Sequence, residues 1–102
     1  MKSLDDQIIA VHISIEKVEK SIEKVEKSIE EVEKKIEEVE KKIEEAIGNE
    51  KEALRAKKAQ LRDEEAQLRA KKIQLRDEEV QLRAEEIIFL NAKFHPTGKR
   101  YS

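Results

Sequence analysis

The chain has 102 residues, of which 45% are charged and only 3% aromatic, with two glycines, one proline and no cysteine. This composition excludes a compact globule with a large core, and it excludes a disulfide framework or a thiolate metal site. The 24 acidic and 22 basic residues leave a net charge of −2 and alternate finely, so they produce no field that would attract nucleic acid or an anionic membrane.

The first predicted element is a helix over residues 3 to 47. Ser3 can cap it, with Asp6 three residues later and acidic side chains at the positive end of the helix dipole. Ile and Val then alternate at spacings of 3 and 4, which puts Ile at heptad position a and Val at position d of a coiled-coil seam. The members of this stripe are Ile8, Val11, Ile15, Val18, Ile22, Val25, Ile29, Val32, Ile36, Val39 and Ile43. Glutamates recur at position e, at Glu19, Glu26, Glu33 and Glu40.

A turn is predicted at residues 48–49. Gly48 suits the left-handed residue that ends a helix, and Asn49 suits the cap of the next one, with Glu52 three residues later. A single continuous helix that tolerates Gly48 is the alternative. That alternative would put charged residues at position a beyond residue 48, so we favour a helical hairpin.

The second predicted helix covers residues 50 to 94, and a polar, basic tail follows from 95 to 102, where Pro96 ends the helix. This helix repeats a 14-residue unit and has apolar residues on two faces. Leucines form one face: Leu54, Leu61, Leu68, Leu75 and Leu82. The other face, which Asp63 and Asp77 interrupt, contains Ala59, Ala66, Ile73, Val80 and Ile87. The two aspartates either fix the helix register from a buried position or lie at its edge, facing solvent or lysines.

The first helix can cover only one of these faces. The pattern alone does not decide which, but the Ile/Val/Ala face has the a/d spacing, so we expect it to form the intrachain seam. The leucines would then form a dimer interface, because soluble monomers rarely expose such a stripe. The Lys57-Lys58 pair faces Glu78-Glu79 if two copies pair antiparallel about Leu68, whereas a parallel pair would set like charges together. The expected fold is therefore all-α: an antiparallel two-helix hairpin, a single coiled-coil unit over residues 1–102, that associates into a four-helix homodimer.

Nothing in the sequence indicates catalysis. Adjacent carboxylates such as Glu30-Glu31 point to different sides of a helix, and the inward-facing Glu-x-x-His pairs of di-iron bundles are absent. A hairpin would bring His12 and His95 to the same end, either as a shared ligand site or as two solvated imidazoles. We expect no catalytic residue, no metal ligand and no cofactor. We also expect a soluble chain without a transmembrane segment or signal peptide, in a compartment that the sequence does not identify.

The arm SIEKVEKSIEEVEKKIEEVEKKIEEA, a short polar break, and the arm LRAKKAQLRDEEAQLRAKKIQLRDEEVQLR together resemble the coiled-coil region of Crinkler-type proteins, which are effector-like proteins of oomycetes and some fungi. The resemblance covers about residues 8–86. The translocation motif L-x-L-F-L-A-K of that family is not in this chain, nor is a C-terminal effector domain. The resemblance implies a connecting or oligomerising segment of a larger protein. A designed or repeat-expanded coiled coil would have the same pattern.

The function expected from these patterns is that of a scaffold or spacer that assembles with itself. One alternative is a module that binds a helix of another protein through the leucine stripe of the second helix. Another is an amphipathic helix that binds lipid, but a narrow a/d seam without Trp suits a helix partner better than a bilayer. The mass of the pure chain in solution separates the first two functions.

Overall fold

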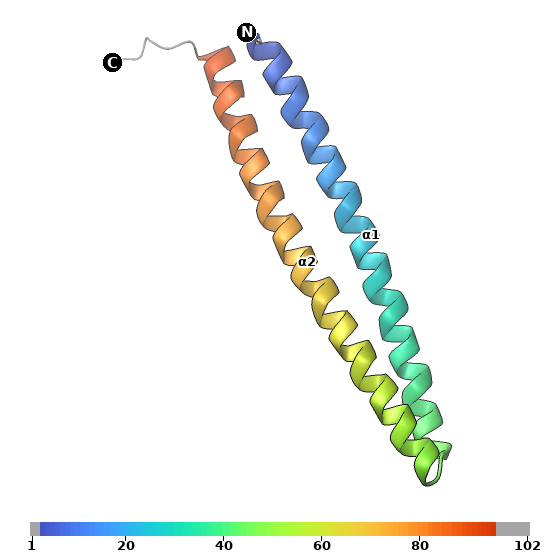
Figure 1. Ribbon diagram of the computed structural model, residues 1–102. Coiled ribbons are helices and arrows are strands. Elements are labelled where there is room, and N and C mark those ends of the chain that lie inside the picture. The colour runs from blue at the N-terminus through green and yellow to red at the C-terminus, as the bar shows by residue number, and fades with distance from the viewer. Residues whose placement is uncertain (1–2, 96–102) are drawn as a thin grey trace. The chain divides into compact units, whose positions relative to one another are not determined.

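The computed structural model describes residues 3–95, and two long helices account for most of them (Figure 1). Helix α1 covers Leu4–Glu45 and helix α2 covers Asn49–Phe94. No strand occurs between residues 3 and 95. The prediction of an all-α helical hairpin is confirmed, while the association of two hairpins stays a prediction. The basic tail, including the helix stop expected at Pro96, lies outside the described residues except for the exposed His95.

Helix α1 begins at a side-chain cap. The hydroxyl oxygen of Ser3 accepts a hydrogen bond from the amide of Asp6 at 3.1 Å, and the carbonyl of Ser3 accepts one from the amide of Gln7. The first bond satisfies a first-turn amide that has no carbonyl partner within the helix, and the second is the first backbone bond of the helix itself. Asp5 and Asp6 lie in the first turn, where negative charge is favoured by the helix dipole.

The connection between the helices turns at Gly48. Helix α1 ends at Glu45, earlier than predicted, and the next amide, of Ala46, still bonds to the carbonyl of Lys42. Gly48 has a φ of 65°, a left-handed conformation that other residues adopt only at a cost. Its carbonyl accepts a hydrogen bond from the amide of Lys51, in the first turn of α2. Nothing lies within 4 Å of the place where a Cβ atom at position 48 would be. Glycine is therefore favoured here by its backbone conformation, and not because a side chain would clash.

The chain divides into two compact units, and each contains a segment of both helices. Unit 1 consists of Met1–Ile22 and Gln74–Ser102, and unit 2 consists of Glu23–Ile73. The α1 stripe is buried in both units: Val11, Ile15, Val18 and Ile22 in unit 1, and Val25, Ile29, Val32, Ile36 and Val39 in unit 2. Ile8 and Ile43 are half-buried. The core of each unit is thus one row of apolar side chains beneath a second helix.

The leucines of α2, not its Ile/Val/Ala face, cover the α1 stripe. In unit 2, Leu61 is buried in a cluster with Val32, Ile36 and Val39, and Leu54 and Leu68 pack against the same cluster. In unit 1, Leu75, Leu82 and Phe89 are half-buried. The assignment of Leu54, Leu61, Leu68, Leu75 and Leu82 to a dimer interface crossing near Leu68 is therefore wrong.

The opposite face of α2 is exposed. The five residues expected to complete the intrachain seam are all exposed: Ala59, Ala66, Ile73, Val80 and Ile87. That expectation is wrong as well, and the aspartates of the same face explain why. Packing this face on α1 would bury Asp63 and Asp77 against Ile and Val, and an unpaired charge in apolar surroundings is costly. The leucine face avoids this cost because the charged residues beside it have partners of opposite charge: Lys58 pairs with Glu40, and Arg69 pairs with Glu65.

Candidate functional site

A row of ion pairs runs along one side of the seam in each unit. Its α1 members recur every seven residues, at heptad position e: Asp5, His12 and Glu19 in unit 1, and Glu26, Glu33 and Glu40 in unit 2. Within each unit the α2 partners run in the opposite order along the chain, so the two helix segments are antiparallel. We call this set of contacts the ion-pair row. Its partners on α2 change with the 14-residue repeat.

Lysines of α2 meet these glutamates directly. The Nζ of Lys58 lies 2.9 Å from Oε2 of Glu40, and the Nζ of Lys72 lies 3.0 Å from Oε2 of Glu26. Both lysine side chains are about two-thirds covered, and their ammonium groups reach the glutamates of the other helix. In unit 1, Lys93 makes the corresponding contact with Asp5, at 2.6 Å.

The charges of one such pair affect its acid–base behaviour. The hydrogen bond and the positive charge of Lys58, with a smaller contribution from Arg62, lower the pKa of Glu40 from its ordinary value of 4.5. The carboxylate is thus held in its charged form by the cation across the seam. This is the expected signature of an interaction that forms only when both helices are in register.

At alternate positions of the ion-pair row, α2 has a glutamate instead of a lysine. An arginine of α2 then pairs with the glutamates of both helices. Glu65 would face Glu33 with like charge, but Nη2 of Arg69 lies 2.7 Å from the carboxylate of Glu33 and 3.1 Å from that of Glu65. The guanidinium therefore bridges two carboxylates, one from each helix, a task for which its several donors suit it. Sequence reasoning missed these arginines. The available signal was a Glu-x-x-x-Arg pair in alternate repeats.

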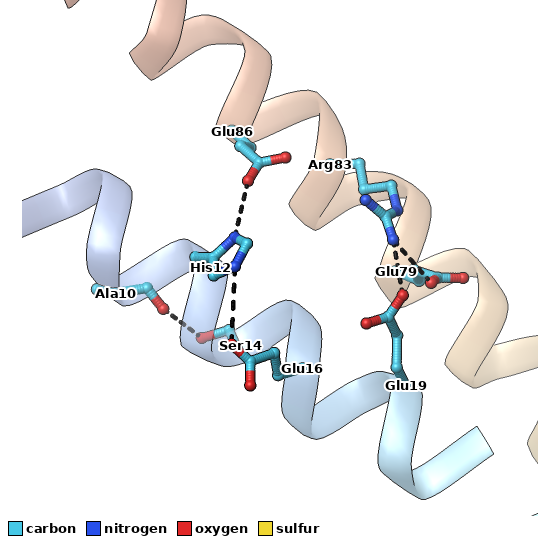
Figure 2. Close-up of polar contacts among 8 residues, drawn as sticks. All are labelled: Ala10, His12, Ser14, Glu16, Glu19, Glu79, Arg83 and Glu86. Atoms are coloured by element: carbon cyan, nitrogen blue, oxygen red, sulfur yellow. Dashed lines mark hydrogen bonds and ion pairs between the residues drawn. The ribbon is translucent and has the colours of Figure 1, made fainter. Parts of the chain in front are cut away.

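Unit 1 repeats the arginine bridge and then departs from it (Figure 2). Arg83 contacts Glu19 at 2.7 Å and Glu79 at 3.5 Å, as Figure 2 shows. Seven residues later, α2 presents Glu86, and α1 has His12 where the other turns have a carboxylate. The Nδ1 atom of His12 lies 3.2 Å from Oε2 of Glu86.

The exception at His12 has a counterpart on α2. Arginine recurs every seven residues on α2 up to Arg83, and Leu90 stands where the next one would fall. It follows Glu86 by four residues, as Arg69 and Arg83 follow their own glutamates. A carboxylate at position 12 would therefore face Glu86 without a bridge. An imidazole avoids that repulsion and forms a hydrogen bond instead.

Short side chains line the other side of the α1 stripe. The hydroxyls of Ser14, Ser21 and Ser28 each donate a hydrogen bond to the carbonyl four residues earlier in α1. In unit 1 a groove of about 280 Å³ opens beside Ser14, with Val11, Leu82 and Phe89 among its lining residues. In unit 2, grooves of about 350 and 340 Å³ lie beside the ion-pair row and are lined mainly by its own charged side chains.

His12 and His95 are the two residues considered for a shared ligand site. His95 lies in the same unit as His12, which is engaged by Glu86 and, at 3.7 Å, by Glu16. Between residues 3 and 95, no group of three or more His, Asp or Glu side chains is arranged to hold a metal ion. Neither α1 nor α2, over the part of the chain that the structure describes, has an apolar stretch of the length needed to cross a membrane.

The remaining feature is the outward face of α2, about 160° around the helix from its leucines at about 100° per residue. We call it the outward stripe, and its apolar members are Ala56, Ala59, Ala66, Ala70, Ile73, Val80, Ala84 and Ile87. All of them are exposed, and Ile73, Val80 and Ile87 are 63%, 66% and 57% exposed. Asp63 and Asp77 lie within this stripe and are exposed too.

In comparisons with known proteins, no family model, no curated protein and no solved structure matches this chain.

Proposed function

We propose that this protein is a non-enzymatic structural module that associates with itself, as a coiled-coil scaffold or spacer. The observation that supports it most is the distribution of side chains on α2. One face is used inside the hairpin, where leucines pack and charged neighbours pair with α1. The opposite face presents an apolar stripe to solvent along the helix, and such surfaces in soluble proteins typically mark interaction sites.

The two faces of α2 have different uses in this proposal. Each ion pair across the seam is worth little energy by itself, since its α1 carboxylate keeps 41–65% of its side-chain area exposed to water. Their value lies in specificity at one point, because a shift of seven residues in either direction would set Glu19 or Asp5 against Glu86, which no arginine follows by four residues to bridge the two carboxylates. A fixed register within each unit presents that unit's part of the outward stripe in one arrangement, as an assembly surface requires.

Sedimentation equilibrium over a range of concentrations tests the proposal. We expect the apparent mass to rise from that of the 11.9 kDa chain to twice this value as the concentration increases. Because only the folded chain would dimerise, the thermal unfolding midpoint should rise with concentration as well. A monomer at every concentration, with full helicity by circular dichroism, would refute self-association. It would favour the alternative in which the module binds a helix of another protein.

A further inference from the structure

We propose that two copies of this chain exchange their α2 helices, so that α1 of each copy packs on α2 of the other with the contacts of the hairpin. This inference rests on the proposed self-association and adds to it the surface, which is the leucine face of α2, and the antiparallel orientation. Exchange of an identical element is a low-cost route to a dimer, because each contact of the monomer is made again between copies. The observations that support it lie in unit 2, Glu23–Ile73.

The contacts between the two helix segments of unit 2 are symmetric about the turn. Lys58 and Glu40 lie equally far from residue 49 along the chain. Lys72 and Glu26 do as well. A two-fold axis beside Asn49 therefore converts each of these ion pairs into the same pair between copies. The apolar cluster of unit 2 forms again in the same way. The two surfaces that meet are those that already fit each other within one chain.

The turn that closes the hairpin is short and makes few contacts. Only residues 46–48 separate the two helices. On one side the amide of Ala46 donates a hydrogen bond to the carbonyl of Lys42, and on the other the amide of Lys51 donates one to the carbonyl of Gly48. Each bond belongs to the end of a single helix, so neither holds the two helices together. Gly48 is exposed and can leave its left-handed conformation at little cost, and short hinge loops favour domain swapping.

Ile47, in this turn, is an apolar residue that the hairpin does not cover. It is 86% exposed, the highest value among the large apolar side chains between residues 3 and 95. It precedes Leu54 by seven residues and thus continues the leucine series of α2. Where the opened connection is helical, Ile47 of each copy lies within about one turn of its counterpart across the two-fold axis. The two side chains cover each other there, so exchange removes apolar surface from water.

The opened connection also has to correct the helical phase. The contact positions of α1 continue from Ile43 to residues 46 and 50, whereas those of α2 extend back from Leu54 to residues 51 and 47. The two series differ by one residue, or about 100° of rotation around the helix. A connection with one extra residue, such as a π-bulge, absorbs this rotation. Gly48 supplies the backbone freedom for it.

Carbodiimide cross-linking of mixed isotopes tests the exchange in the native chain. The Nζ of Lys58 lies 2.9 Å from the carboxylate of Glu40, so the reagent can join the two side chains as an amide. Unlabelled and ¹⁵N-labelled chains are unfolded in urea, mixed in equal amounts and refolded together at a concentration where sedimentation reports the dimer. Exchange predicts that about half of the Lys58–Glu40 cross-links join one labelled and one unlabelled peptide.

The opposite results separate this inference from the proposed function. If the chain dimerises and every Lys58–Glu40 cross-link carries a single label, the copies pair through another surface, such as the outward stripe. This inference then fails while the proposed function stands. If the chain is a monomer at every concentration, both fail.

The length of the turn provides a second test. Insertion of Gly-Ser-Gly-Ser between Gly48 and Asn49 leaves both helices unchanged and lets the hairpin close more easily. We expect this insertion to raise the dimer dissociation constant about tenfold or more. The same insertion between Phe94 and His95, after the end of α2, is the matched control and should leave the constant unchanged. A dimer that tolerates the first insertion as well as the second would overturn the exchange.

Discussion

Leu61 is the position at which truncation should most clearly identify the face of α2 that packs on α1. It is the buried residue of α2, 8% exposed, and it lies among Val32, Ile36 and Val39. Replacing a buried leucine by alanine costs about 2–5 kcal/mol, depending on how far the surroundings collapse into the space. A seam between two helices is open at its sides and can close partly, so we expect about 2–3 kcal/mol for Leu61→Ala. That is a large share of the roughly 5–15 kcal/mol that stabilises an ordinary domain.

Urea unfolding followed by circular dichroism measures this difference. It is carried out at a concentration where sedimentation reports the monomer, so that association does not contribute. Ile73→Ala is the matched control, because Ile73 is 63% exposed and its truncation should change the free energy of unfolding by no more than about 0.5 kcal/mol. If Ile73→Ala cost as much as Leu61→Ala or more, the Ile/Val/Ala face would be the one on α1, and the assignment of the faces would be refuted.

Three further changes probe the turn and the ion-pair row. Gly48→Ala should destabilise the hairpin by about 1 kcal/mol, because alanine is strained at a φ of 65°. Thermal unfolding measures this loss of stability, and an unchanged unfolding midpoint would contradict a left-handed turn. Lys58→Gln should raise the pKa of Glu40, read from its side-chain carboxyl resonance by NMR titration. Since the pKa of Glu40 is lowered in the folded chain, the Lys58–Glu40 pair stabilises the fold at pH values above the unfolded-state pKa of about 4.5. This stabilisation is lost as the pH falls below that value and through the lowered pKa of the folded chain. An unchanged titration of Glu40 in Lys58→Gln would mean that Lys58 does not contact Glu40. His12→Glu should increase amide hydrogen exchange in the surrounding turns of unit 1, and adding Leu90→Arg should reverse the increase; failure of the second change to rescue the first would argue against the arginine-bridge rule.

The amino-acid sequence by itself determined the elements of this protein. The 3–4 spacing of Ile and Val on α1 admits only a helix with one buried stripe, and the structure buries that stripe from Val11 to Val39. The heptad phase of α1 ends at Gly48, where the chain turns. The turn falls on this residue because the left-handed conformation costs glycine little. Such features are local, so a pattern in one segment is enough to predict them.

Only the tertiary structure decided which face of α2 is inside. Spacing favoured the Ile/Val/Ala face, but spacing does not include the cost of burying Asp63 and Asp77, nor the length of the neighbouring charged side chains. The leucine face places Lys58 beside Glu40 and Arg69 beside Glu33, contacts that join residues 18 and 36 positions apart in the chain. A charged residue at the edge of a seam is tolerated when the opposite helix supplies its partner, and that condition depends on both helices at once.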